Sequence, residues 1–192
     1  MSNHIDFYFD IISPYAYIAH KKILNQKNFI FNYKPIFLGG LHNLAGIDAP
    51  AFNKYKMKNM INDCTLISEK NNINFKWNSK FPINSLNIMR GYLVVKEEKQ
   101  KEYLDCFFDA YWKDDRDLSS IENIAKLLSK LNINDYDFFK SIKEQSIKDK
   151  LKELTSDAFQ KEVFGAPTFI VNNKIFWGQD RLEYAIEEFN TN

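Results

Sequence analysis

The alternation of apolar and polar positions divides the chain into two strand-containing ends and a long helical middle. Residues 4–10 predict a strand, because they are apolar and aromatic, with Asp6 and Asp10 at the edges. The next residues, Ser13 and Pro14, suit the cap and the first position of a helix that continues to about residue 26. Residues 29–37 predict a second strand. The N-terminal part is therefore expected to form a β-α-β unit.

The pattern changes after this unit. Residues 39–50 contain three glycines, an aspartate and a proline, and they predict a loop. Apolar residues then recur at helical spacing from about residue 51 to residue 162. Helices are predicted over residues 51–72, 83–100, 100–114 and 119–131, and two more over residues 135–162.

Strands return at the C-terminal end. Residues 166–171 and 174–178 predict a hairpin that turns at Asn172 and Asn173, and a helix started by Asp180 closes the chain. This order is the thioredoxin topology, an α/β fold, with a large helical domain inserted after the second strand. The expected domains are a discontinuous thioredoxin-like domain over 1–40 and 163–192, and an inserted helical domain over 41–162.

Composition narrows the classes of function. The 192 residues are 45% hydrophobic and 16% aromatic, with a formal net charge of +1, which is typical of a globular chain with a substantial core. Because acidic and basic residues are interspersed, we expect neither a nucleic-acid partner nor a membrane surface. Residues 1–6 lack the features of a signal peptide, and Cys64 and Cys106 form neither a CxxC pair nor a metal cluster, so no metal is expected. These features favour a cytoplasmic protein with reduced, buried thiols.

The pair of cysteines that many proteins of this topology carry is absent from its usual position. Many thioredoxin-type oxidoreductases carry Cys-Pro-x-Cys at the turn from the first strand to the first helix, where this chain has Ser13-Pro14-Tyr15-Ala16. The chain cannot cycle a disulfide of its own here. Ser13 either only caps the helix, or its hydroxyl also stabilises an anion such as a bound thiolate, which the helix N-terminus favours. No histidine is an obvious base for Ser13, so a thiolate stabiliser is favoured over a covalent nucleophile.

Two further motifs lie near the C-terminus. Pro167 in Gly165-Ala166-Pro167-Thr168 is either a plain strand-start residue or the cis-proline of the thioredoxin topology, whose preceding residue offers its backbone to a peptide-like ligand. Gln179 and Asp180 either begin the last helix or receive the ammonium and carboxylate of an amino-acid ligand.

In combination these motifs resemble a known family. Residues 5–20, "IDFYFDIISPYAYIAH", and residues 163–189, "VFGAPTFIVNNKIFWGQDRLEYAIEEF", are similar to the 2-hydroxychromene-2-carboxylate isomerases. Those enzymes are close relatives of the kappa-class glutathione transferases within the DsbA-like group. The segment "FPINSLNIMRGYL", residues 81–93, also resembles the family pattern more loosely.

The resemblance implies a glutathione site with a homodimeric assembly. Ser13 would face the glutathione sulfur, and Ala166 would pair with the cysteinyl backbone beside a cis Pro167. Gln179 and Asp180 would hold the γ-glutamyl end, and Lys56 would lie near the glycyl carboxylate. Where the family often has an asparagine after the glycine of its first long loop, this chain has Ile47 after Gly46, which cannot make the same polar contact. Asp48 follows Ile47, and Asn43 or Asn53 could compensate for the missing polar contact.

The implied activity is glutathione-dependent cis-trans isomerisation of a small aromatic or electrophilic substrate, through reversible thiolate addition. Two alternatives remain at this point. One is a kappa-like transferase that joins glutathione to electrophiles, and the other is a non-enzymatic binder of thiols or peptides on the same scaffold. Apolar residues of the helical block are candidates for an acceptor pocket or, with higher expectation, for core: Phe52, Phe107 and Trp112.

Overall fold

A mixed four-stranded sheet receives strands from both ends of the chain. The computed structural model describes residues 3–191. Residues 1, 2 and 192 of the predicted thioredoxin-like domain lie outside the described residues. The strands are β1 (Ile5–Phe9), β2 (Phe31–Pro35), β3 (Thr168–Val171) and β4 (Lys174–Trp177), in the spatial order β2-β1-β3-β4. β1 pairs with β2 in parallel and with β3 in antiparallel orientation. The predicted α/β thioredoxin-like fold with a helical insertion is confirmed.

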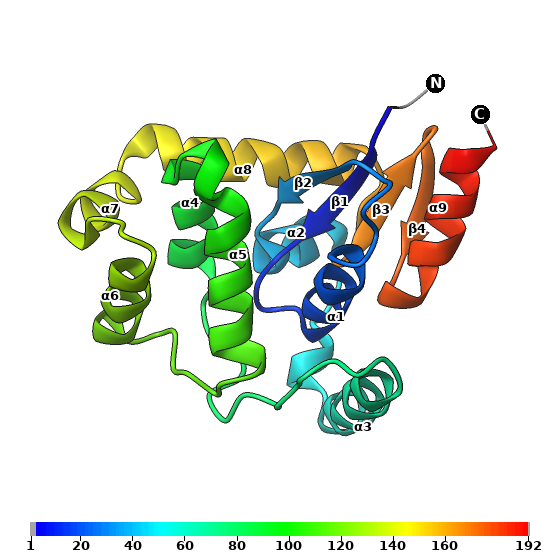
Figure 1. Ribbon diagram of the computed structural model, residues 1–192, viewed down its shortest axis with the longest axis horizontal. Coiled ribbons are helices and arrows are strands. Elements are labelled where there is room, and N and C mark those ends of the chain that lie inside the picture. The colour runs from blue at the N-terminus through cyan, green and yellow to red at the C-terminus, as the bar shows by residue number, and fades with distance from the viewer. Residues whose placement is uncertain (1–2, 192) are drawn as a thin grey trace.

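Some helices pack beside the sheet, and others form the insertion (Figure 1). They are α1 (Pro14–Ile23), α2 (Leu38–Ala45), α3 (Lys54–Lys70), α4 (Leu86–Val94), α5 (Glu97–Trp112), α6 (Ile121–Lys130), α7 (Asp135–Ser141), α8 (Gln145–Gln160) and α9 (Leu182–Asn190), with short 3-10 turns at Pro50–Phe52 and Gln179–Arg181. Among the described residues, no helix combines the length and the apolar character that crossing a membrane requires.

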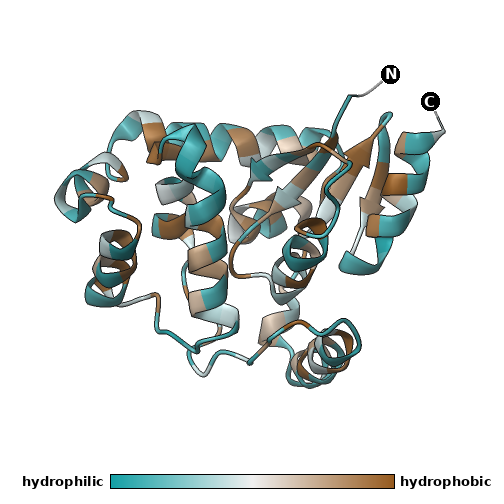
Figure 2. Cartoon of the chain, viewed as in Figure 1, coloured by the Kyte–Doolittle hydropathy of each residue, from teal (hydrophilic) through white to brown (hydrophobic). Residues whose placement is uncertain are grey.

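The alternation along β1 creates two cores. Ile5, Phe7 and Phe9 are fully buried in the larger cluster, which includes α1, α9 and the apolar faces of α4 and α5. Tyr8 points to the opposite face, where it packs with Leu41 of α2 and Ala158 of α8. In Figure 2 the strand β3 is largely brown, whereas the long α8 alternates between teal and brown. The period-2 pattern of the strand thus assigns separate helices to each face of the sheet.

The predicted loop over 39–50 is wrong, because most of it forms α2. Phe37 packs its ring over the first turn: a Cβ at Gly39 or at Gly40 would lie 3.0 Å from that ring. The glycines therefore admit an aromatic side chain rather than break the helix. The left-handed residue Gly46 (φ 64°) ends α2 in the usual way.

Two predicted helix boundaries also differ from those of the structure. The helix predicted over 83–100 is two helices, because Val95 leaves the helical conformation (ψ 138°) and is buried. A new helix then starts with Glu97 and Glu98, whose charges favour a helix N-terminus. The last helix begins at Leu182 after a 3-10 turn, so Asp180 does not cap it. The hairpin is confirmed, since Asn172 and Asn173 have φ values of 51° and 60°.

A buried carboxylate joins three elements at the end of β1. Asp10 is fully buried, and its Oδ2 accepts hydrogen bonds from the Leu38 backbone N–H (2.8 Å) and the Ser85 hydroxyl (3.0 Å). Its Oδ1 accepts from the Ile12 backbone N–H at 3.1 Å. Asp10 therefore caps α2 from outside the helix, holds the residue before α4, and closes the turn toward Ser13. Burial raises the pKa of Asp10 to about 6, although these hydrogen bonds act in the opposite direction.

We expect Asp10 to make folding stability depend on pH. Because its pKa is higher in the folded chain than in the unfolded one, the folded state binds more protons between these values, and its stability falls as the pH rises through them. Lowering the pH from about 7.5 to about 4.5 should stabilise the wild type by about 2 kcal/mol relative to Asp10→Asn. Urea unfolding of both proteins at the two pH values measures this difference.

The exposed Asp135 provides a control, because Asp135→Asn should keep the pH dependence of the wild type. Identical pH dependence in the wild type and Asp10→Asn would contradict the assignment.

Candidate functional site

The turn between β1 and α1 holds Ser13 in a defined orientation. Ser13 is the N-cap of α1, and its Oγ accepts a hydrogen bond from the Ala16 N–H at 3.2 Å. The same hydroxyl donates to the carbonyl oxygen of Ala166 at 2.8 Å. Only 4% of Ser13 is exposed. The capping role expected from the sequence is confirmed, and the hydroxyl has in addition a specific partner from the other end of the chain.

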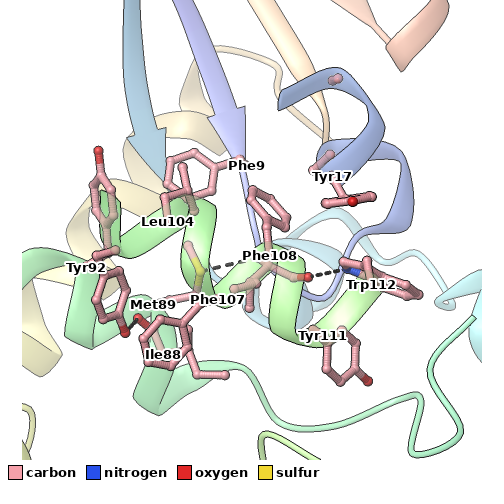
Figure 3. Close-up of a cluster of buried hydrophobic side chains, with 14 of the residues drawn as sticks. Phe9, Tyr17, Ile88, Met89, Tyr92, Leu104, Phe107, Phe108, Tyr111 and Trp112 are labelled. Carbon is pink, nitrogen blue, oxygen red and sulfur yellow. Dashed lines mark hydrogen bonds between the residues drawn. The ribbon is translucent and has the colours of Figure 1, made fainter. Parts of the chain in front are cut away.

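The helical insertion fixes the residues just before Ser13 (Figure 3). The backbone N–H of Ile11 points to the Met89 sulfur (3.4 Å), and the indole N–H of Trp112 donates to the Ile11 carbonyl (2.8 Å). Trp112 and Phe107 are fully buried, so both belong to the core and do not line an acceptor pocket. Side chains of α4 and α5 therefore position the turn that presents Ser13.

A cis peptide bond lies directly opposite Ser13. The Ala166–Pro167 bond is cis, as the topology predicts, and Ala166 is nearly buried. The carbonyl of Pro167 accepts a hydrogen bond from the Gly178 N–H at 3.0 Å. One continuous set of contacts thus runs from the N-terminus of α1 through Ala166 and Pro167 to the end of β4.

Exposed aromatic rings flank this cis bond. Phe164 and Trp177 are 39% and 53% exposed, and their ring centroids are 4.8 Å apart. A Cβ at Gly165 would lie 2.6 Å from the Trp177 indole nitrogen, so glycine is needed for this close approach. These rings are not among the site residues predicted from the sequence. Their signal was an aromatic residue immediately before the glycine of each motif, at Phe164-Gly165 and at Trp177-Gly178.

Gln179 and Asp180 follow Gly178 but differ from each other in exposure. Gln179 is buried, and its Oε1 accepts a hydrogen bond from Lys22 Nζ at 2.6 Å. Asp180 is exposed and pairs with Arg181 at 3.2 Å. Burial lowers the pKa of Lys22, against the opposing effect of Glu183 and Asp180. A 360 Å³ cavity between α1 and the start of α9 is lined by Lys22, Gln179 and Asp180, and Lys22 is a polar partner that was not predicted from the sequence.

The remaining candidates lie apart from Ser13 or are engaged elsewhere. Lys56 is exposed in the first turn of α3, with no described contact to Ser13 or Ala166. Asn53 caps α3 by accepting from the Tyr55 and Lys56 N–H groups, so its oxygen is already used. Ile47 is 41% exposed after α2. Phe52 is 80% exposed on the surface next to α3 and is not part of the core.

The two cysteines take no part in this arrangement. Cys64 is buried, and burial raises its pKa. Cys106 is only partly buried, which differs from the expectation that both thiols are fully buried, and burial again raises its pKa. Both thiols are therefore weakly nucleophilic near neutral pH.

The arrangement around Ser13 suits anion binding rather than disulfide exchange. A hydroxyl and a helix N-terminus meet a cis-proline loop, and neither Ser13 nor Ala16 carries sulfur. The one proton of the Ser13 hydroxyl points to the Ala166 carbonyl. Rotation about the Cβ–Oγ bond of Ser13 would turn this proton toward a bound anion, because a charged acceptor competes well with a neutral carbonyl.

Comparison with known proteins extends over nearly the whole chain. The chain is 24% identical to a 2-hydroxychromene-2-carboxylate isomerase of Sphingobium xenophagum over 96% of both chains. It is 25% identical to glutathione S-transferase kappa 1 of Caenorhabditis elegans, over 93% of this chain and 87% of that protein. A solved 2-hydroxychromene-2-carboxylate isomerase superimposes with a TM-score of 0.88 at 22% identity, covering 97% of this chain and 94% of the other.

The family model of the DSBA-like thioredoxin domain matches residues 4–189. This match includes both strand-containing ends and the whole helical insertion. The chain therefore belongs to the DSBA-like thioredoxin domain family, with 2-hydroxychromene-2-carboxylate isomerases and a kappa-class glutathione transferase among its full-length homologues.

Proposed function

We propose that the protein is a glutathione-dependent isomerase that acts on a small aromatic substrate. The observation that carries the proposal is the Ser13 hydroxyl at the N-cap of α1, 2.8 Å from the Ala166 carbonyl beside the cis Pro167. A dithiol at this turn would support redox chemistry, whereas a hydroxyl and free helix N–H groups support an anion supplied from outside. The full-length isomerase homologues favour isomerisation as the reaction class.

The residues present fit glutathione in charge and polarity. Asp180 offers an exposed carboxylate for an ammonium group, and the Gln179 amide with Lys22 offers donors for a carboxylate. Lys56 is the proposed partner of the glycyl carboxylate. Ala166 offers its backbone N–H to the cysteinyl unit, in the manner of a cis-proline loop.

In the proposed mechanism the chain binds and orients rather than reacts covalently. Glutathione held here as a thiolate would supply a nucleophile for reversible addition to an unsaturated carbon, which turns a double bond into a rotatable single bond until departure of the same thiolate restores it. Ser13 turns its proton from the Ala166 carbonyl to the sulfur and so favours the charged form of the thiol. The N-terminus of α1 adds a favourable dipole at the same point. Phe164 and Trp177 offer an aromatic surface beside the reacting atoms.

We expect Ser13→Ala to weaken thiolate stabilisation without unfolding the protein. Loss of one hydrogen bond to a charged sulfur should raise the pKa of bound glutathione by about one to two units and lower isomerase activity about 10- to 100-fold near neutral pH. Isothermal titration of glutathione and the ultraviolet absorbance of the thiolate, followed between about pH 6 and about pH 9, measure the pKa. Conversion of 2-hydroxychromene-2-carboxylate measures the activity.

The matched control is Ser120→Ala, which removes the same type of N-cap hydrogen bond from α6. Both variants should lose about 1 kcal/mol of stability from the cap, and only Ser13→Ala should change glutathione chemistry. If Ser13→Ala behaves like Ser120→Ala in every thiol assay, the proposed role of Ser13 is wrong. Activity with a chlorodinitrobenzene and none with the chromene carboxylate would indicate a kappa-like transferase instead.

Asp180→Asn should reduce affinity for glutathione about 10-fold, because the γ-glutamyl ammonium loses its carboxylate partner. N-acetylcysteine lacks that ammonium, so its weaker binding should not change. Titration of both thiols into the wild type, Asp180→Asn and the exposed control Glu187→Gln measures the effect. Equal losses for the two thiols would show that Asp180 acts on the fold of the site and not on the γ-glutamyl group.

A further inference from the structure

A separate cavity lies at the opposite end of α1 from Ser13. Its volume is 570 Å³, and its walls come from the end of α1, from β2 and the residues before it, from α4 and from the first half of α5. Neither Ser13 nor Ala166 lines it. The ten residues of α1 span about 15 Å, so the two places are well separated. The volume is within the usual range for small-molecule sites.

The walls of this cavity combine aromatic and aliphatic side chains with a larger polar surface, and the apolar part is the one that can hold a ring. Phe29, Phe31 and Tyr33 approach from the sheet side, and Tyr92 and Leu104 from the insertion. Such walls suit a flat, apolar ring. The cavity thus lies where the helical insertion meets the strands, a place where ligand sites often occur.

A buried hydrogen-bond network makes one wall rigid. The Tyr33 hydroxyl lies 3.0 Å from His20 Nδ1, and His20 Nε2 lies 3.1 Å from Asp105 Oδ1. His20 and Lys21 hold the pKa of Asp105 below its usual range, so it is a carboxylate, while burial lowers the pKa of His20. Neutral His20 therefore donates through Nε2 and accepts the Tyr33 proton at Nδ1. This fixes the Tyr33 ring and leaves its oxygen as an acceptor only.

Tyr92 lines the cavity with a hydroxyl that is available to a ligand. It is 6% exposed, and its hydroxyl has no hydrogen-bond partner among residues 3–191. Burial and the nearby Glu97 raise the pKa of Tyr92 to about 12, so the hydroxyl keeps its proton. The Tyr92 carbonyl accepts from Gln100 Nε2 at 3.2 Å, which fixes the end of α4. Solvent reaches this hydroxyl, so a ligand in the cavity would replace water as its hydrogen-bond acceptor.

The rim is positively charged on balance. Lys27 and Lys101 line the cavity and are exposed, and neither forms an ion pair within the described part of the chain. Glu97 is the one acidic residue of the lining. Two cations against one carboxylate favour an anionic group at the mouth, although their exposure makes each contribution modest.

We propose that this cavity is a second binding site, for a small aromatic carboxylate whose ring packs between Phe31 and Leu104. The carboxylate accepts the Tyr92 hydroxyl proton and faces Lys27 and Lys101. The site is independent of Ser13 and of glutathione. The ligand would lie where the helical insertion meets the sheet.

Binding of 1-naphthoate, with neutral 1-naphthamide as its matched counterpart, tests the proposal by isothermal titration. Wild-type protein should bind the acid about 10-fold more tightly than the amide. Tyr92→Phe, which removes only the hydroxyl, should weaken binding of the acid about 5- to 10-fold, and so should the double variant Lys27→Gln with Lys101→Gln. Tyr136→Phe, on an exposed tyrosine of α7, should have no effect.

Two comparisons separate this site from the one at Ser13. Binding of 1-naphthoate should be unchanged in Ser13→Ala and in the presence of saturating glutathione. The proposal is overturned if no saturable binding is seen, if Tyr92→Phe binds like the wild type, if acid and amide bind equally, or if glutathione displaces the acid.

Discussion

The buried carboxylate of Asp10 is the interaction on which the geometry of the rest depends. One side chain accepts from the start of α2, from Ser85 before α4 and from the turn that leads to Ser13. It therefore connects the sheet, the first helix after the β-α-β unit and the helical insertion at a single point. A buried charge is costly unless hydrogen bonds satisfy it, and here three donors do so. The raised pKa of Asp10 shows that these donors only partly offset the cost of burial.

The turn between Asp10 and Ser13 is likewise held by contacts from distant parts of the chain. Ile11 makes backbone contacts to Met89 and Trp112, so residues of α4 and α5 hold the chain between Asp10 and Ser13. The insertion is thus more than a cover for one side of the sheet. Its packing determines where the N-terminus of α1 points, and the same helices approach the sheet again through His20, Tyr33 and Asp105. A change in the core of the insertion therefore acts on both ends of α1.

The proposed function depends on how the Ser13 hydroxyl is held in the free protein. Its proton is directed to the Ala166 carbonyl, and its oxygen is used as a helix cap. The group is held in place by weak neutral partners that a charged ligand can outcompete. Preorganisation of this kind costs little in the free protein and keeps the donor within reach of an anion.

The sequence by itself determined the elements whose signals are local. The strand alternation of residues 5–9, the cap at Ser13-Pro14, the Asn172-Asn173 turn and the resemblance of both ends to one family were sufficient for the fold and for the cluster of Ser13, Ala166 and Pro167. Helix α2 was hidden, because its cap is a carboxylate 28 positions earlier in the chain. The sequence also could not predict the hydrogen bond between Gln179 and Lys22, the contact between the rings of Phe164 and Trp177, or the cavity beside Tyr92, since each joins residues that are apart in sequence. Only the tertiary structure decided these features, because hydrogen-bond partners and buried surfaces depend on distances that local spacing does not encode.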